Sequence, residues 1–181
     1  MASSSVFLSV LCMIFILFCQ PFPPAKSDEN LIESLCSKTE EPVICSDCLN
    51  SDPTSKAADA HALGLIAVRC AEYDATQLYE VVSNLSLNIS GGTPFKTVLD
   101  GCSEKMLEAK DDFTGVLRSA EAMDYSTAKG IITDQIQPLA NWCLDQFDKL
   151  PDLLPVPSMV LAGTEAVNQD CKILLGMLDN I

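Results

Sequence analysis

The chain has 181 residues, with 25 acidic against 11 basic side chains, a formal net charge of −14 and nine cysteines. So acidic a chain excludes a nucleic-acid-binding protein, which needs a basic surface to displace phosphate counterions, and argues against docking on anionic lipid. The eight glycines and the low aromatic content of 6% disfavour a β-sandwich or barrel.

Residues 1–27 have the pattern of a signal peptide. Residues 6–19 form an uncharged apolar run that is too short to cross a bilayer, because a span takes about 20 apolar residues. The small-x-small triplet Ala25-Lys26-Ser27 follows as a cleavage site. We expect cleavage to leave residues 28–181 as one secreted domain without a membrane segment. Its net charge is about −15, because the leader contains one base and no acid.

Seven cysteines remain after the leader, an odd number that leaves at least one outside any intramolecular bridge. In an oxidising compartment, cysteines far apart in sequence favour disulfides over a metal site. The single histidine and the lack of paired CxxC clusters also disfavour zinc. The one CxxC, Cys45-Ser46-Asp47-Cys48, is interpreted as a cysteine of a structural bridge beside an extra buried thiol.

Residues 28–51 predict two short helical segments separated by Pro42. Each segment is too short to be stable alone, since isolated helices of fewer than about 12–15 residues are marginal in water. A bridge between Cys36 and Cys45 would close this helical hairpin. The hairpin then has two options, to pack on its own chain or on a neighbouring molecule.

Residues 52–181 predict an all-α fold, an up-down four-helix bundle with short connections. Apolar residues recur at spacings of three and four from Thr54 to about Leu87, after a start at Asp52-Pro53. Gly91-Gly92 ends this segment, and Thr93-Pro94 supplies the cap and first-turn proline of a second long helix.

A third long helix is expected from near Asp124, and Pro138 should kink or break it because proline removes a backbone hydrogen bond. Three prolines between Leu150 and Pro157 indicate a loop, and the last helix is expected from about Ser158. Two sequons, at Asn84 and Asn88, fall where the first long helix should end. Both are predicted glycosylation sites in a secreted protein.

No catalytic motif occurs in the chain, and no second histidine is present to work with His61. His61 is therefore interpreted as a surface residue, and paired carboxylates in so acidic a chain are ordinarily solvated. We expect no enzymatic activity, no catalytic residue, no metal and no cofactor. A helical lipid carrier is disfavoured because the chain has no adjacent Cys-Cys pair.

Two motifs in the N-terminal region carry a family resemblance. Residues 36–45 read CSKTEEPVIC and residues 49–55 read LNSDPTS. The pattern CxxTxxPxxC followed by LxSDPxS resembles the plant invertase and pectin methylesterase inhibitor family. Further matches, which extend the resemblance over residues 28–181, are found at residues 99–104, 124–125, 143–147 and 171–176.

The resemblance implies a four-helix bundle with an N-terminal helical hairpin, and a reversible 1:1 block on a secreted carbohydrate-active enzyme. It also implies bridges between Cys36 and Cys45 and between Cys102 and Cys143. The remaining cysteines lie outside this pattern: Cys48 and Cys70 have the options of pairing with each other, of remaining buried thiols, or of one bridging to Cys171. Pro138 departs from the family, which keeps this helix continuous.

The stretch from Asp124 to Ala128 bears on the identity of the target. Invertase inhibitors that it resembles often carry Pro-Lys-Phe after the aspartate, whereas this chain has Tyr125-Ser126-Thr127. Asp-Tyr is found in pectin methylesterase inhibitors, although some invertase inhibitors share it. The prediction is thus a secreted inhibitor of pectin methylesterase in the apoplast. The alternative is an inhibitor of acid invertase in the cell wall or vacuole.

A cluster of carboxylates is the predicted partner-binding surface. Glu104, Glu108 and Asp111 stand at i, i+4 and i+7, which places them on one helix face. A Cys102–Cys143 bridge would bring Asp145 alongside, and we call these four carboxylates the acidic patch. Their charge pattern alone indicates a solvated face flanked by Lys105 and Lys110. The resemblance makes the patch, together with Asp124 and Tyr125, the predicted interface with the enzyme.

Overall fold

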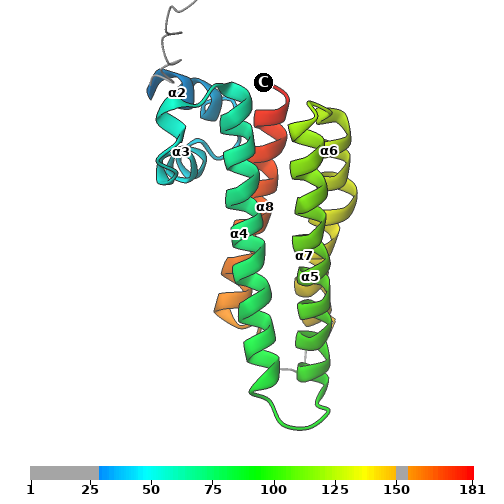
Figure 1. The fold of residues 1–181 in the computed structure, drawn as a ribbon. Coiled ribbons are helices and arrows are strands. Elements are labelled where there is room, and N and C mark those ends of the chain that lie inside the picture. The colour runs from blue at the N-terminus through cyan, green and yellow to red at the C-terminus, as the bar shows by residue number, and fades with distance from the viewer. Residues whose placement is uncertain (1–28, 150–154) are drawn as a thin grey trace, which may run out of the picture.

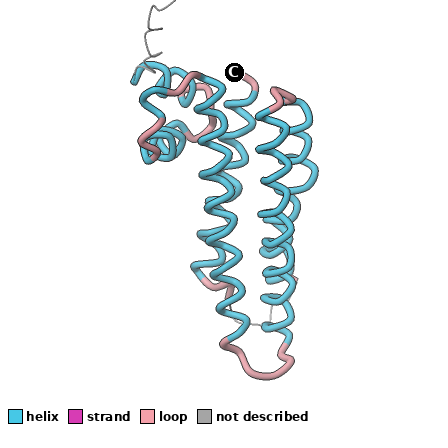
Figure 2. Tube along the Cα trace, viewed as in Figure 1, coloured by secondary structure: helices cyan, strands magenta, loops and turns pink. Residues whose placement is uncertain are grey.

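The structure is a computed structural model that describes residues 29–149 and 155–181, so the expected signal peptide lies outside the described residues. All regular elements in these two ranges are helices, as Figures 1 and 2 show. The predicted all-α fold is therefore confirmed. No helix of the described chain has the length and apolarity that a membrane span requires.

The N-terminal helical hairpin is formed by α2 (Glu29–Cys36) and α3 (Pro42–Ser51), which the Cys36–Cys45 disulfide connects. Pro42 occupies the first turn of α3, where its missing N–H costs no helical hydrogen bond. Leu49 is completely buried, and the hairpin contacts α4 and α8. The hairpin thus packs on its own bundle, at one end of these two helices (Figure 1).

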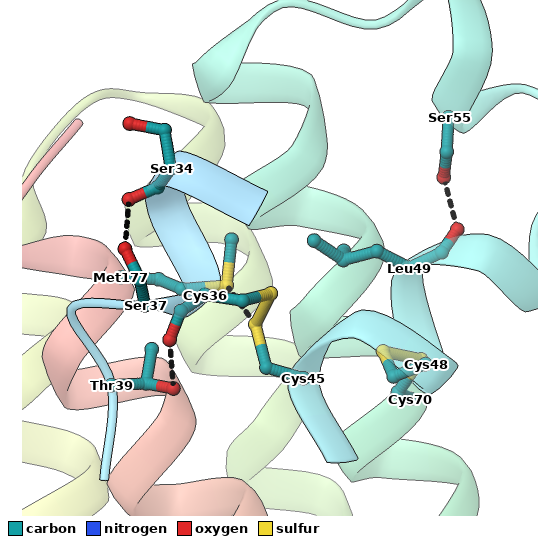
Figure 3. Close-up of a disulfide and its surroundings, with 10 residues drawn as sticks. All are labelled: Ser34, Cys36, Ser37, Thr39, Cys45, Cys48, Leu49, Ser55, Cys70 and Met177. Atoms are coloured by element: carbon teal, nitrogen blue, oxygen red, sulfur yellow. Dashed lines mark hydrogen bonds between the residues drawn. A yellow bond between two sulfur atoms is a disulfide. The ribbon is translucent and has the colours of Figure 1, made fainter. Parts of the chain in front are cut away.

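A second disulfide joins Cys48 in α3 to Cys70 in α4, with their Cα atoms 6.2 Å apart. Figure 3 shows both disulfides side by side within the hairpin region. The interpretation of Cys48 as an extra buried thiol was therefore wrong, because the packing of α3 on α4 brings Cys70 to it. Cys171 is a free, buried thiol, and burial raises its pKa to about 12 with a smaller contribution from the charge of Asp170.

The first long helix, α4 (Ala60–Leu87), begins later than predicted. Asp52 and Pro53 lie in a turn, in which the Asp52 carboxylate accepts hydrogen bonds from the backbone N–H and the hydroxyl of Thr54. The short 3-10 helix η1 (Ser55–Ala57) follows. Asp59 is the N-cap of α4, and its side chain accepts a 2.8 Å hydrogen bond from the Ala62 N–H. The predicted start of this helix at Asp52-Pro53 was thus wrong: a turn and η1 come first, and the helix starts at Ala60.

The second and last long helices are α5 (Pro94–Glu121) and α8 (Ser158–Leu178). Thr93 caps α5 as predicted, and its hydroxyl accepts a hydrogen bond from the Lys96 N–H. In Figure 1, α4 and α5 form a long antiparallel pair that is joined at the end of the molecule opposite the hairpin. The helix α8 packs against α4 and α7, which closes the bundle.

The predicted third helix consists of three consecutive pieces, α6 (Tyr125–Ile131), the π-helical turn η2 (Ile132–Ile136) and α7 (Gln137–Asp148). The ring of Pro138 would clash with the carbonyl of Asp134 in a regular α-helix. The wider π turn accommodates the proline, so the helix is locally altered at the predicted place and continues without a break.

The expected bridge between Cys102 and Cys143 is not formed: both residues are buried free thiols in the core. The two side chains are in hydrogen-bond contact, which together with burial raises the pKa of the Cys143 thiol. The packing of α5 against α7 brings the two sulfur atoms together without a covalent bond. The lack of a disulfide does not separate α5 from α7, because Cys102 and Cys143 are still in contact.

Candidate functional site

The acidic patch lies on the outer surface of α5 and α7. Glu104, Glu108 and Asp111 are exposed on α5, as their spacing predicted, and Asp145 is exposed on α7. Glu104 and Asp145 each lie two residues beyond the touching thiols of Cys102 and Cys143, a rise of about 3 Å along each helix but in opposite directions, because α5 and α7 run antiparallel. Glu104 and Asp145 are thus about 6 Å apart along the bundle axis, whereas Glu108 and Asp111 continue along α5, with Asp111 about 10 Å beyond Glu104.

One of the two flanking lysines forms an ion pair within the acidic patch. Lys105 Nζ donates a 2.7 Å hydrogen bond to Glu108 Oε2, and this contact raises the pKa of Lys105. A further carboxylate borders the patch at Asp112. Burial, and then the negative charges of Glu108 and Asp111, raise the pKa of Asp112. The surface is thus acidic but partly neutralised by its own lysine.

An apolar side chain stands among these carboxylates. Leu107 is 40% exposed, three residues after Glu104 and four before Asp111, which places it on the same face of α5. The sequence analysis did not include Leu107. Its signal was present in the spacing, because a leucine at this position interrupts an otherwise charged helix face. The patch therefore combines charge with an apolar contact surface.

The two remaining predicted interface residues, Asp124 and Tyr125, are not part of the acidic patch. They lie at the turn between α5 and α6, beyond the last residue of α5 at Glu121. Ten helical residues separate Asp111 from Glu121, a distance of about 15 Å along the axis. The six predicted residues therefore form two separate groups, the acidic patch and this turn.

Both side chains at the turn serve the local fold. Asp124 is the N-cap of α6 and accepts a 3.1 Å hydrogen bond from the Thr127 N–H. The side chain of Thr127 and then this backbone hydrogen bond hold the pKa of Asp124 below its usual value. The hydroxyl of Tyr125 lies 3.0 Å from His61 Nδ1, and the two share a hydrogen bond between α6 and α4. His61 is thus half-buried and has a structural partner, which the sequence interpretation missed.

Met123 completes this turn in an unusual conformation. Its φ is +59°, in the left-handed region that favours glycine, and its side chain is 65% exposed. Two backbone hydrogen bonds, from Met123 N to Ala120 O and from Asp124 N to Ser119 O, hold the turn. An apolar side chain is therefore presented to solvent next to Asp124. The sequence did not indicate this conformation, because methionine, unlike glycine or asparagine, is not typical of left-handed positions.

The close approach of α5 and α7 depends on Gly101. A Cβ atom at this position would lie 2.5 Å from a ring carbon of Trp142 on α7. The absence of a side chain lets the indole pack directly on the backbone of α5. This contact fixes the spacing of the two helices that carry the acidic patch.

The described residues contain no group of three or more histidine, cysteine, aspartate or glutamate side chains that could hold a metal ion.

The predicted glycosylation sites lie at the end of α4, where Asn84 is exposed and Asn88 is the C-cap. The Asn88 amide donates a 2.8 Å hydrogen bond to the Asn84 carbonyl.

Comparisons with known proteins agree with the motifs. The family model for the plant invertase/pectin methylesterase inhibitor matches residues 30–177. The chain is 28% identical over 176 residues to a pectinesterase inhibitor of Actinidia deliciosa, which covers 96% of this chain and 91% of that protein. It is 30% identical over 185 aligned positions to cell wall / vacuolar inhibitor of fructosidase 2 of Arabidopsis thaliana, which covers 100% of this chain and 99% of that protein.

Two solved structures show the same fold. A pectin methylesterase inhibitor from Arabidopsis thaliana superposes with a TM-score of 0.61 at 18% identity, covering 84% of this chain and 97% of that one. A mutant form of a pectin methylesterase inhibitor from Arabidopsis superposes with a TM-score of 0.67 at 19% identity, covering 83% and 96%. Since the family model spans most of the sequence, the chain belongs to the plant invertase/pectin methylesterase inhibitor family, a family of inhibitor proteins rather than enzymes.

Proposed function

We propose that this protein is a secreted inhibitor of pectin methylesterase, which it binds reversibly in a 1:1 complex that covers the substrate cleft. The observation that carries this choice of target is the turn at Met123–Tyr125. After Asp124 the chain has Tyr125-Ser126-Thr127, where invertase inhibitors of the family often carry Pro-Lys-Phe, and Asp-Tyr is found in pectin methylesterase inhibitors. The similarity to the Actinidia pectinesterase inhibitor supports the same target.

Steric exclusion is sufficient for this activity. The surface of α5 and α7 carries the acidic patch with Leu107, and the turn beyond the end of α5 exposes Met123. Charged groups at such a surface speed association and orient the partner, while apolar side chains contribute to its retention. No covalent step is needed, so inhibition is expected to be reversible on dilution.

The alternative target is an acid invertase of the cell wall or vacuole. It is favoured by one observation, the 30% identity to the Arabidopsis inhibitor of fructosidase over the whole chain. A side-by-side assay of the mature protein against a pectin methylesterase and an acid invertase separates the two targets. Inhibition of the invertase alone would overturn the proposal in favour of the alternative.

A triple substitution tests the acidic patch. We expect Glu104→Gln with Glu108→Gln and Asp111→Asn to weaken inhibition of pectin methylesterase about tenfold, mainly through slower association, because charge removed from an interface lowers the association rate. The measurement is the inhibition constant together with the association rate at low salt.

A matched control removes the same charge elsewhere. Glu33→Gln with Glu80→Gln and Glu165→Gln neutralises three exposed carboxylates on α2, α4 and α8. Because both triple variants have the same net charge, any difference between them is local. Equal inhibition by the two variants would remove the acidic patch from the mechanism.

A further inference from the structure

A pocket of about 500 Å³ lies between the N-terminal hairpin and the bundle helices α4 and α8. We call it the hairpin pocket. Its apolar lining includes Ile44, Ile66 and the Cys48–Cys70 disulfide, which Figure 3 shows at the junction of α3 and α4. In Figure 1 the hairpin lies on the side of α4 away from α5, so the pocket is separate from the acidic patch.

The lining residue Asp170, on α8, has a carboxylate oxygen without a hydrogen-bond partner. The residue is only 5% exposed, and its buried Oδ2 accepts no hydrogen bond from the described residues. A buried carboxylate oxygen without a donor is costly, and few such atoms persist in native structures without a ligand, water or ion.

The neighbour of Asp170 is a second carboxyl group, Asp74 on α4. Two ionised carboxylates have no hydrogen to donate, so Asp74 leaves the Oδ2 of Asp170 without a donor unless one of the two groups carries a proton. Burial, followed by the negative charge of Asp74, raises the pKa of Asp170 to about 8. With its pKa raised in this way, Asp170 retains a proton at neutral pH, and a ligand that donates to this carboxyl group competes with that proton.

The other charged groups of the hairpin pocket are Asp47 and Asp52 from the α3 side and Arg69 from α4. Asp52 is already hydrogen-bonded to Thr54, and no ion pair of the described chain joins Arg69 to Asp74 or Asp170. The lining thus has four carboxyl groups and one guanidinium. Its residual charge favours a cation, and its apolar wall favours one with a hydrocarbon stem.

We propose that the hairpin pocket binds an alkylammonium group, which donates hydrogen bonds to the unpartnered Oδ2 of Asp170 and to the Asp74 carboxylate. An ammonium donates three hydrogen bonds, enough to satisfy both carboxylates, and its methylene chain lies against Ile44, Ile66 and the disulfide. A pocket of this volume suits a small ligand. The displaced proton passes to solvent, so ligand affinity increases as the pH rises toward 8.

The same chemistry has two sources, a free aliphatic diamine and the lysine side chain of a protein. Isothermal titration of the mature protein at about pH 6, with 1,4-diaminobutane, N-acetyl-lysine methylamide and butane-1,4-diol, distinguishes them. Both amines are expected to bind and the diol is not. Tighter binding of the diamine assigns a free amine as the ligand, and tighter binding of the blocked lysine assigns a protein side chain.

Proton release gives a readout that packing alone does not produce. Titrations in two buffers of different ionisation enthalpy should show about one proton released per amine bound. Asp170→Asn and Asp74→Asn should each weaken binding at least tenfold, and Asp170→Asn should also abolish this release because it removes the group that carries the proton. Glu80→Gln, an exposed position on the same helix as Asp74, should change neither. Circular dichroism and thermal unfolding establish that each variant is folded.

Three outcomes would overturn the proposal. The first is no binding of either amine to the wild-type protein at roughly 10 mM. The second is binding that both aspartate variants leave unchanged. The third is binding of calcium without binding of amines, which would replace the ammonium by a metal ion. None of these outcomes depends on which enzyme the protein inhibits.

Discussion

At the turn between α5 and α6, three consecutive residues each have a separate task. Met123 provides the left-handed backbone, Asp124 caps α6, and Tyr125 is hydrogen-bonded to His61 on α4. The two residues that resemble the family motif therefore act on the shape of the turn. Their influence on a bound enzyme is expected to pass through the position of the exposed Met123 side chain.

Asp124→Ala tests this interpretation of the cap. The variant loses the acceptor for the Thr127 N–H, so we expect the thermal midpoint to fall by about 2–4 °C and inhibition to weaken with it. Asp124→Asn retains a capping oxygen and should behave like the wild-type protein in both measurements. An alanine variant with unchanged stability would show that the turn does not need its cap.

Sequence spacing predicted part of this site and not the rest. The face of Glu104, Glu108 and Asp111 follows from helical periodicity, and the Lys105–Glu108 pair at i, i+3 follows from the same rule. The contact between His61 and Tyr125 does not, because 64 residues separate them and only tertiary packing brings them together. The burial of Asp170 could not be predicted from the sequence either, since it depends on where the hairpin packs.

Among the helices, α5 and α7 form the pair that carries the acidic patch. Their contact relies on the flat indole of Trp142 against Gly101 and on the adjacent thiols of Cys102 and Cys143. Interiors are close-packed, so a change of one methyl group at such a contact displaces the neighbouring helix.

Gly101→Ala should destabilise the bundle by about 1–3 kcal/mol, because the new methyl group displaces the Trp142 ring and outweighs the gain in helix propensity. Gly130→Ala is the matched control in α6, where nothing lies within 4 Å of the added methyl group. That variant should be stabilised by about 0.4–1 kcal/mol. Urea unfolding measures both, and shifts of the same sign would contradict this account of the α5–α7 contact.

Helix existence was predictable from apolar periodicity, and the starts of α5 and α8 and the Cys36–Cys45 bridge were predictable too, whereas the start of α4 and the pairing of Cys48 were not. Asp52 and Asp59 are both residues that can cap a helix N-terminus. Asp52 accepts its hydrogen bonds from Thr54 and so stabilises a turn, whereas Asp59 accepts from Ala62 N–H and caps α4. Cys48 pairs with Cys70 because α3 lies against α4, a relation that spacing along the chain does not contain. Pro138 marked the irregular segment but not its π-helical form.

For the molecule as a whole, the excess of acid is handled differently at the surface and in the interior. Hydrogen bonds lower the pKa of exposed carboxyl groups such as Asp52, Asp100 and Asp124. Burial raises the pKa of Asp170 instead. The first group adds stability that is lost as the pH falls below about 4, and the buried residue has the opposite effect over a different range.

Between pH 3.8 and about 8, the folded protein retains a proton at Asp170 that the unfolded chain has already released. Stability should therefore decrease as the pH rises through this range, with a slope of up to ~1.4 kcal/mol per pH unit. Asp170→Asn removes the titrating group and should flatten the profile. Urea unfolding of both proteins at several pH values between about 5 and 8 tests this, and parallel profiles would exclude Asp170 as the cause.

The crosslink between Cys48 and Cys70 also determines what a protease can remove. Scission at an exposed residue of the segment between Ser51 and Ala60, such as Pro53 or Thr54, would divide the polypeptide in two, yet both pieces would stay covalently attached through these sulfur atoms. The nicked molecule would keep the mass of the intact one, increased by one water. Only a reductant would then release the amino-terminal fragment from the rest of the protein.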